Sequence, residues 1–99
     1  MRYTYRVIVS FKHAGLQRFY ESGVKSGINP AHADKLARML SVLDQVHNPA
    51  PLLTFPGYRA HKLTESFAGY WSLRVSGNWR LIFRFAGEDV ELVDYLDYH

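Results

Sequence analysis

The chain ends with side chains that could transfer protons: a carboxylate at Asp97, a phenol at Tyr98 and an imidazole at His99. A further imidazole, His61, lies in the second half of the chain. Histidine changes its charge close to neutral pH, so imidazoles and carboxylates together suit general acid–base catalysis. The alternative interpretation is an accidental tail that only trails into solvent.

Basic side chains gather upstream of this carboxy-terminal group. They are Arg59, Lys62, Arg74, Arg80 and Arg84, and one acid, Glu65, accompanies them. The following segment, 88–97, is acidic instead. Arginine can bind two phosphate oxygens at once through its planar N–H donors, so the basic segment indicates a phosphate-binding surface. A basic face that only contacts water is the other interpretation.

The composition is that of one packed domain spanning residues 1–99. Of these residues, 47% are hydrophobic and 15% are aromatic, and the formal net charge is +3. The absence of cysteine excludes disulfides, thiolate nucleophiles and cysteine-bound zinc, and it fits a cytoplasmic protein. We expect neither a membrane span, which needs about 20 apolar residues, nor a signal peptide.

The remaining histidines do not indicate a metal site. We expect His13, His32 and His47 on helix surfaces or in loops, and the last two are too far apart for one helical turn. No cofactor is expected either. Trp71 and Trp79 are expected in the core rather than as platforms for stacking bases.

Apolar spacing predicts one strand and two helices in the first half of the chain. The segment Tyr3–Val9 alternates like a strand, and Ser10 could cap a helix that stops at Gly23. The pair Asn29–Pro30 is a strong helix start. An apolar stripe follows at helical spacing, made of Ala33, Leu36, Met39 or Leu40, Leu43 and Val46. The proline-rich segment 47–57 is expected to be a loop.

From residue 58 onward the apolar period changes to two, which predicts strands. We expect them at 58–63, 70–75, 79–86 and 89–96. The order is then β-α-α-β-β-β-β. Two amino-terminal helices would cover the apolar face of a small, largely antiparallel sheet, which is an α+β fold.

The hairpin around Gly77 allows its register to be predicted. Only a loop with an odd number of residues, 76–78, keeps the apolar sides of both strands together. The resulting pairs are Val75–Trp79, Arg74–Arg80, Ser72–Ile82 and Tyr70–Arg84. Two arginines opposite each other repel, which favours a pocket for an anion over a purely structural sheet. The alternative is that each arginine pairs with a carboxylate, for example on the acidic last strand.

These residues resemble a known family. The segment 10–23, the His61-x-Leu63 motif, the run 69–85 and the terminal 97–99 are similar, in this order, to the HigB branch of the RelE/ParE toxin superfamily. The resemblance covers nearly the whole chain and implies the RelE-like fold.

The resemblance also implies a function. Members of this branch are similar to ribosome-dependent messenger-RNA endonucleases that a helix-turn-helix, HigA-like antitoxin holds inactive. Operator DNA would be contacted only through that antitoxin. The functional residues of the family fall on His61, Arg80, Asp97, Tyr98 and His99. The lysine that often follows the His-x-Leu motif is replaced by Thr64, so either Lys62 substitutes for it or one positive charge near the phosphate is missing.

Metal-free RNA cleavage needs a base for the 2′-OH, cations for the phosphate and an acid for the leaving 5′-oxygen. Arg80, alone or together with Arg74, would stabilise the phosphate; Arg84, Lys62 and Tyr98 would bind substrate, with Tyr98 stacking on a base. His61 and Asp97 are the expected acid–base pair, with His99 assisting, and which group is the base stays open. Asp94 is expected on the strand face opposite Asp97, so the two form no carboxylate dyad.

Two alternatives stay open. One is a ParE-like toxin that binds a DNA-manipulating enzyme without cleaving RNA, although a pure binding module needs no imidazole at His61. The other is a weak toxin that acts mainly as an antitoxin-bound co-repressor. The replacement of the family lysine by Thr64 supports this alternative.

Overall fold

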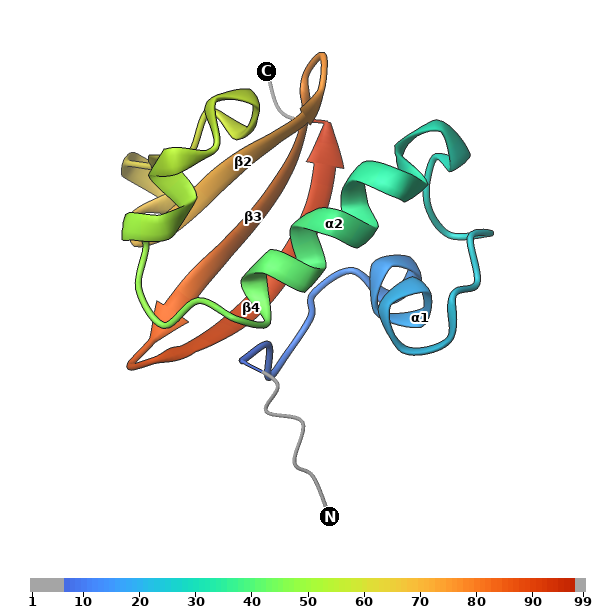
Figure 1. Cartoon of the computed structure of the whole chain (residues 1–99), viewed down its shortest axis with the longest axis horizontal. Coiled ribbons are helices and arrows are strands. Elements are labelled where there is room, and N and C mark those ends of the chain that lie inside the picture. The colour runs from blue at the N-terminus through green and yellow to red at the C-terminus, as the bar shows by residue number, and fades with distance from the viewer. Residues whose placement is uncertain (1–6, 98–99) are drawn as a thin grey trace.

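The computed structural model describes residues 7–97. In this range, helices α1 (Ala14–Ser22) and α2 (Ala33–Leu43) are followed by strands β1 (His61–Lys62), β2 (Tyr70–Ser76), β3 (Trp79–Ala86) and β4 (Asp89–Asp97). The strands form one antiparallel sheet in the order β1-β2-β3-β4 (Figure 1). Short 3-10 turns link these elements at Pro30–His32, Ala50–Thr54, Pro56–Tyr58 and Glu65–Phe67. The predicted α+β class is confirmed.

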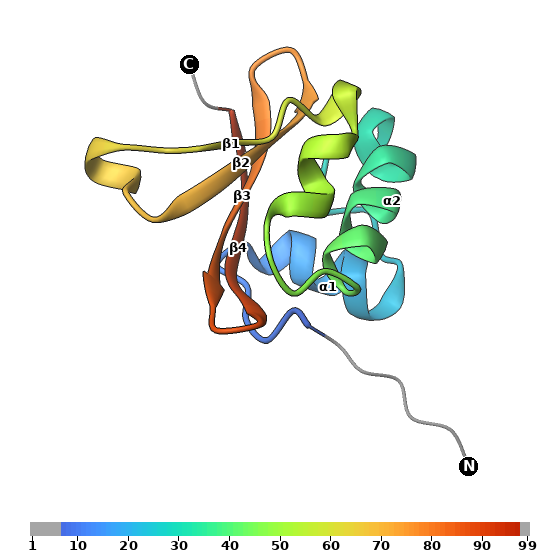
Figure 2. The ribbon, with the colours of Figure 1, turned by 60° about the vertical axis from the view of Figure 1, so that its left-hand side comes forward.

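The two helices and the turns Ala50–Thr54 and Pro56–Tyr58 lie on one side of the sheet (Figure 2). The core fills the space between these layers, and its largest fully buried side chains include Leu16, Leu36, Met39, Leu81 and Phe83. Its β2 and β3 residues, Leu73, Val75, Leu81 and Phe83, belong to the predicted apolar alternation, and Trp71 and Trp79 pack against it half-buried. These helices do not cover the opposite face of the sheet, where Ser72 and Ile82 are buried and Arg74 and Arg80 are half-buried.

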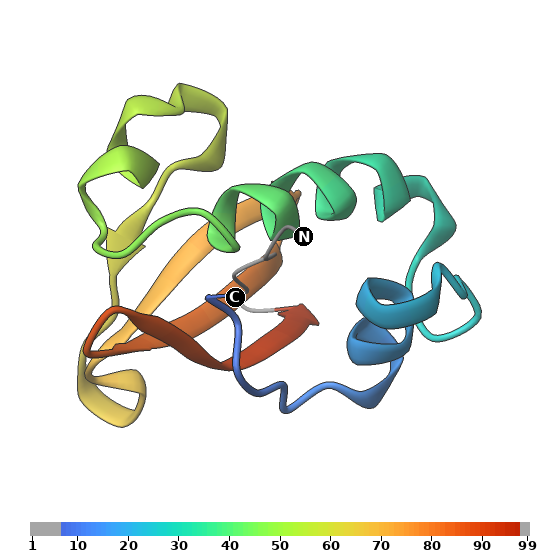
Figure 3. The ribbon, with the colours of Figure 1, turned by 60° about the horizontal axis from the view of Figure 1, so that its bottom comes forward.

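The segment before α1 lies parallel to β4 (Figure 3). The amide of Val9 donates to the carbonyl of Val90 at 2.8 Å, and the amide of Lys12 donates to that of Val93 at 2.8 Å. Of the predicted strand Tyr3–Val9, residues 3–6 lie outside the described residues. The rest makes isolated bridges rather than a regular strand, so the predicted first strand is confirmed only in part.

The predicted cap of the first helix is wrong. The Ser10 hydroxyl accepts a hydrogen bond from the amide of Leu92 at 2.8 Å, because Ser10 belongs to the segment that bridges to β4. The cap is His13, whose Nδ1 accepts from the amide of Leu16 at 2.9 Å. The predicted stop is confirmed, since Gly23 adopts the left-handed conformation with φ of 77°.

The predicted start of the second helix is confirmed. The side chain of Asn29 accepts from the amide of Ala31 at 2.9 Å, and Pro30 opens the 3-10 turn that leads into α2. The predicted apolar stripe is buried along its whole length. The helix nevertheless ends at Leu43, and Val46 reaches the core from the turn that follows.

Three of the four predicted β2–β3 pairs are confirmed: Tyr70 with Arg84, Ser72 with Ile82, and Arg74 with Arg80. The fourth is wrong, because Trp79 pairs with Ser76 and not with Val75. Val75 is the extra residue of a β-bulge. Like the predicted three-residue loop 76–78, this bulge keeps the apolar sides of the two strands together. The remaining tight turn places Gly77 at a φ of 56°.

The predicted strand 58–63 is much shorter than expected. Tyr58 ends a 3-10 turn, and Arg59 has a φ of 46°, so the backbone turns sharply and pairing is restricted to His61 and Lys62. No helix within residues 7–97 is long and apolar enough to cross a membrane.

Two glycines let α1 approach the connector that leads to α2. A Cβ atom on Gly15 would lie 2.5 Å from the carbonyl oxygen of Gly27. We expect Gly15→Ala to lower the free energy of unfolding by about 1–3 kcal/mol, because this clash outweighs the usual gain of alanine in a helix. Denaturant unfolding measures the change. The control, Gly57→Ala, points into open space and should stay within about 0.5 kcal/mol of the parent; a neutral Gly15→Ala would contradict the expected clash.

Candidate functional site

The strand register groups several predicted site residues on the sheet face opposite the helices. His61 pairs with Ser72, Ser72 with Ile82, and Ile82 with Asp94, so these residues form one row across the four strands of residues 7–97. Arg74 and Arg80 form the next row. Paired residues share a face, so His61 and both arginines belong to the same surface.

The guanidiniums of Arg74 and Arg80 converge on one carbonyl at the tip of the β2–β3 hairpin. Nε of Arg74 donates to the oxygen of Gly77 at 3.3 Å, and Nη1 of Arg80 donates to the same oxygen at 2.8 Å. Nη1 of Arg80 also lies 3.3 Å from the carbonyl oxygen of Trp79. Because both guanidiniums bond to the same carbonyl oxygen, most of their N–H donors are available to bind an anion.

A third cation extends this basic surface toward α2. The pKa of Lys35 is lowered first by partial burial and then by the positive charges of Arg74 and Arg38. None of these cations makes a salt bridge with a carboxylate within the described part of the chain. The hairpin tip is therefore a place where positive charges crowd together.

Arg84 differs from the other arginines of this face. Its Nε lies 3.3 Å from a carboxylate oxygen of Glu91, and its guanidinium carbon lies 5.9 Å from the centre of the Tyr70 ring. The alternative interpretation, an arginine paired with an acid of the last strand, thus holds for Arg84. It does not hold for Arg74 or Arg80 among residues 7–97.

His61 is exposed at the edge of the sheet, and a backbone contact orients its ring. Its Nδ1 lies 3.0 Å from the carbonyl oxygen of Arg59. A carbonyl can only accept a hydrogen bond, so Nδ1 carries the proton in this contact. The lone pair of a neutral ring is then on Nε2, where it can take a proton. The neighbouring Lys62 pairs with Trp71, so it lies on the other side of the strand from His61.

Asp97 lies at the same end of the sheet as the hairpin tip. It pairs with Trp79, the residue before Arg80, whereas Arg80 pairs with Leu96. Strand alternation therefore assigns Asp97 and Arg80 to opposite faces of the sheet end, although the Arg80 guanidinium folds back toward the Trp79 carbonyl. Tyr98 and His99 lie outside the described residues.

Asp94 pairs with Ile82, on the face opposite Asp97, as the strand pattern predicted. Its Oδ1 accepts from the amide of Tyr95 at 2.9 Å. No group of three or more potential metal ligands occurs in the described part of the chain.

The prediction that His32 lies on a helix surface or in a loop is wrong. Its side chain is buried, with 7% exposed, and its Nδ1 lies 2.6 Å from the Tyr95 hydroxyl. The reason is long-range: β4 brings Tyr95 beneath the first turn of α2. The only local signal was the position of His32 directly before the apolar stripe that starts at Ala33.

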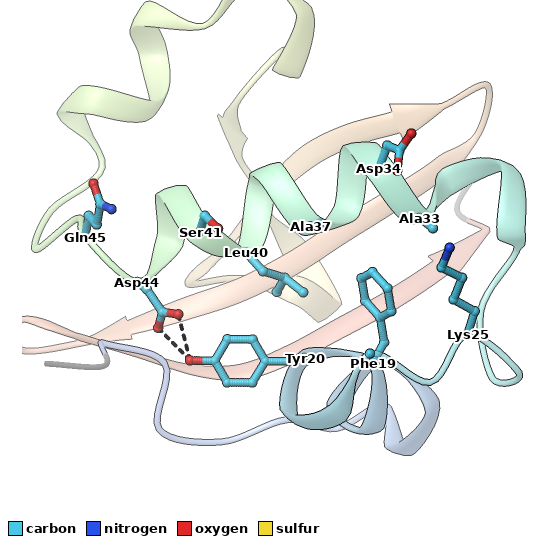
Figure 4. A pocket seen from close by; sticks show the side chains of 11 residues that line it. Phe19, Tyr20, Lys25, Ala33, Asp34, Ala37, Leu40, Ser41, Asp44 and Gln45 are labelled. Atoms are coloured by element: carbon cyan, nitrogen blue, oxygen red, sulfur yellow. Dashed lines mark hydrogen bonds between the residues drawn. The ribbon is translucent and has the colours of Figure 1, made fainter. Parts of the chain in front are cut away.

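A groove of about 740 Å³ lies between α1 and α2 (Figure 4). Phe19, Tyr20 and Leu40 contribute apolar surface to it. At one end, the Tyr20 hydroxyl donates to the carboxylate of Asp44, with oxygen–oxygen distances of 2.8 and 2.7 Å. The groove contains none of the predicted site residues.

The fold and this cationic face define a small α+β domain suited to binding a polyanion. The chain belongs to the HigB-like toxin family, described as RelE-like toxins of type II toxin–antitoxin systems, whose family model matches residues 9–99. Its relative Endoribonuclease HigB from Proteus vulgaris is 37% identical over 93 residues, covering 94% of this chain and all of the relative. Toxin HigB-1 from Vibrio cholerae serotype O1 is 34% identical over 92 residues, covering 92% and 96%.

This membership confirms the predicted family and implies that a protein antitoxin is the partner of the chain. The names of the two relatives, a toxin and an endoribonuclease, support a toxin with ribonuclease activity.

Proposed function

We propose that the chain is a ribosome-dependent endoribonuclease that cleaves messenger RNA by metal-free attack of the 2′-OH on the adjacent phosphate. The observation that carries this proposal is the pair of arginines, Arg74 and Arg80, whose guanidiniums converge on the Gly77 carbonyl, on the sheet face that also carries His61. The relative named Endoribonuclease HigB supports it independently.

Arg80, assisted by Arg74, stabilises the phosphate during the reaction. Negative charge builds on the non-bridging oxygens when the 2′-oxygen attacks, and donors held in place before the reaction stabilise that charge most effectively. The Gly77 carbonyl holds both guanidiniums at the hairpin tip and opposes their mutual repulsion. This fixed pair serves as the phosphate site of the enzyme.

His61 transfers a proton through Nε2. Strand spacing puts its Cα about 8 Å from that of Arg74 and about 12 Å from that of Arg80, so long side chains can meet at one phosphodiester. The Arg59 carbonyl fixes the ring by accepting from Nδ1. In its neutral form His61 accepts the 2′-OH proton, and in its protonated form it donates to the leaving 5′-oxygen.

Asp97, Tyr98 and His99 complete the site in this proposal. Asp97 or His99 carries the second proton transfer, and Tyr98 stacks on an unpaired base. Asp97 pairs with Trp79, the residue before Arg80, on the opposite face of the sheet end, so the proposal requires the RNA to pass around this end to contact both Asp97 and Arg80. Arg84 and Lys62 bind neighbouring parts of the RNA.

The proposed chemistry yields a 2′,3′-cyclic phosphate and a free 5′-OH. The nucleophile belongs to the substrate, so DNA cannot react. In the resting complex, a HigA-like helix-turn-helix antitoxin binds the toxin and supplies the contact with operator DNA.

Induction of the toxin in cells, followed by mapping of transcript 5′ ends, tests this function. We expect discrete new 5′-OH ends inside translated regions, which disappear when translation of the reporter transcript is blocked by removing its ribosome-binding site. A synthetic messenger with a 2′-deoxy sugar at the mapped position should resist cleavage by ribosomes supplied with the toxin. Intact transcripts accompanied by a DNA-damage response would instead identify a ParE-like toxin.

A further inference from the structure

A buried hydrogen bond joins the start of α2 to the end of β4. His32 is 7% exposed and Tyr95 is 3% exposed, and Nδ1 of His32 lies 2.6 Å from the Tyr95 hydroxyl oxygen. The amide of Asn29, in the turn that precedes α2, donates to the same hydroxyl at 3.4 Å. The two partners are 63 residues apart in the chain, so this contact is purely tertiary.

The direction of the bond follows from its surroundings. Burial raises the pKa of the Tyr95 phenol, so the hydroxyl keeps its proton at neutral pH. The hydroxyl oxygen accepts from the Asn29 amide, and Nδ1 of His32 is the acceptor that residues 7–97 offer for its single proton. In this bond the Tyr95 hydroxyl therefore donates and His32 accepts.

Aromatic rings extend this contact to the strand that carries Arg80. The rings of Trp79 and Tyr95 stack with centroids 4.7 Å apart, and the His32 ring meets Trp79 edge-on at 5.7 Å. The His13 ring meets Tyr95 edge-on at 5.4 Å. Trp79 directly precedes Arg80 and pairs with Asp97, while Tyr95 lies two residues before Asp97.

We propose that His32 is a positioning residue for the nuclease site: by accepting the Tyr95 hydroxyl proton, it holds the ends of β3 and β4 so that Arg80 and Asp97 are correctly placed. This inference rests on the proposed function. Strand ends fray unless they are tied down, and Trp79–Asp97 is the last pair of these two strands. The His32–Tyr95–Trp79 cluster ties this end to the first turn of α2.

A positioning role predicts loss of the chemical step rather than loss of substrate binding. A displacement of about 1 Å can lower the rate about 100-fold even when the displaced group itself is intact. His32 does not lie on the face that carries Arg74, Arg80 and His61, so its replacement removes no side chain that contacts the phosphate. The cleavage rate should therefore fall while the affinity for the ribosome changes little.

Paired substitutions test the acceptor. His32→Leu fills much of the volume without an acceptor, whereas His32→Asn can present an amide oxygen near the position of Nδ1. Single-turnover cleavage of messenger on ribosomes measures the maximal rate and the half-saturating ribosome concentration. We expect His32→Leu to lower the maximal rate at least about tenfold with the half-saturating concentration within about twofold, and His32→Asn to restore most of the rate.

A second variant, Tyr95→Phe, tests the same hydrogen bond if His32→Leu does not fold. Tyr95→Phe removes the same proton and keeps the ring stack, so it should lower the maximal rate to a similar extent. The double variant should cleave messenger no more slowly than either single variant, because each substitution removes the same hydrogen bond. Thermal unfolding checks that each variant is folded at the assay temperature.

The outcomes separate this inference from the function on which it rests. Equal rates for the parent, His32→Leu and Tyr95→Phe, in a toxin that loses cleavage on Arg80→Ala, would overturn the positioning role alone. So would equal losses for His32→Leu and His32→Asn, because the acceptor would then be irrelevant. A parent protein that cleaves no messenger on ribosomes would overturn the proposed function itself.

Discussion

Arg80→Ala is expected to lower the rate of messenger cleavage by about 100- to 1,000-fold. Removing one fixed donor from a charge-stabilising site typically costs this much, because no other group is held ready where the charge develops. In this protein the neighbouring Arg74 shares the Gly77 carbonyl with Arg80, so it retains part of the stabilisation. Single-turnover cleavage on ribosomes measures the effect, and 5′-end mapping after induction in cells shows the loss of cleavage sites.

The control for Arg80→Ala is Arg18→Ala. Arg18 is exposed on α1, on the helix side of the sheet, so its removal changes the net charge equally without touching the hairpin tip. We expect the control to cleave at the parental rate. Equal toxicity and equal transcript ends for the parent and Arg80→Ala would show that the arginine pair is not the phosphate site.

His61→Leu is expected to have the second large effect, a loss of about 100- to 10,000-fold in cleavage rate, the range typical of a missing general acid or base. The side chain is exposed, and within residues 7–97 its hydrogen bond is the one to the Arg59 carbonyl, so the fold should tolerate the change. The expected stability change lies within about 0.5 kcal/mol. Thermal unfolding and single-turnover cleavage, measured on one preparation, check both expectations.

The matched control for His61→Leu is His47→Leu, since His47 is an exposed histidine in the loop after α2. It should leave the cleavage rate unchanged. A His61→Leu variant that cleaves as fast as this control would remove His61 from the proposed mechanism and would leave the proton transfers to the carboxy-terminal residues.

Much of the fold follows from local patterns. The stripe from Ala33 to Val46 predicted which side of α2 is buried, and the alternation in β2 and β3 predicted which residues face the core. The predicted pairing of Arg74 with Arg80 is confirmed because apolar alternation restricts the register to values that keep both apolar sides together. The bulge at Val75 was not predictable, since a bulge and a longer loop satisfy the same alternation.

The candidate site was predictable in part. The sequence indicated a phosphate-binding arginine pair, and the structure shows these guanidiniums on one carbonyl. It left open that the arginines pair with acids of the last strand, but it did not indicate that Arg84 alone of the three would do so, with Glu91, because that contact depends on the irregular register between β3 and β4. The roles of the carboxy-terminal residues remain proposals.

The sequence by itself determined the family, the α+β class, the helix start at Asn29–Pro30 and the placing of Arg74 opposite Arg80, because each depends on residue type and on spacing over a few positions. Only the tertiary structure decided that His32 is buried against Tyr95 and that the Arg80 guanidinium folds back to the hairpin tip. The physical reason is range: local periodicity determines which face a side chain occupies, whereas its partners come from segments that meet only when helices and sheet pack together.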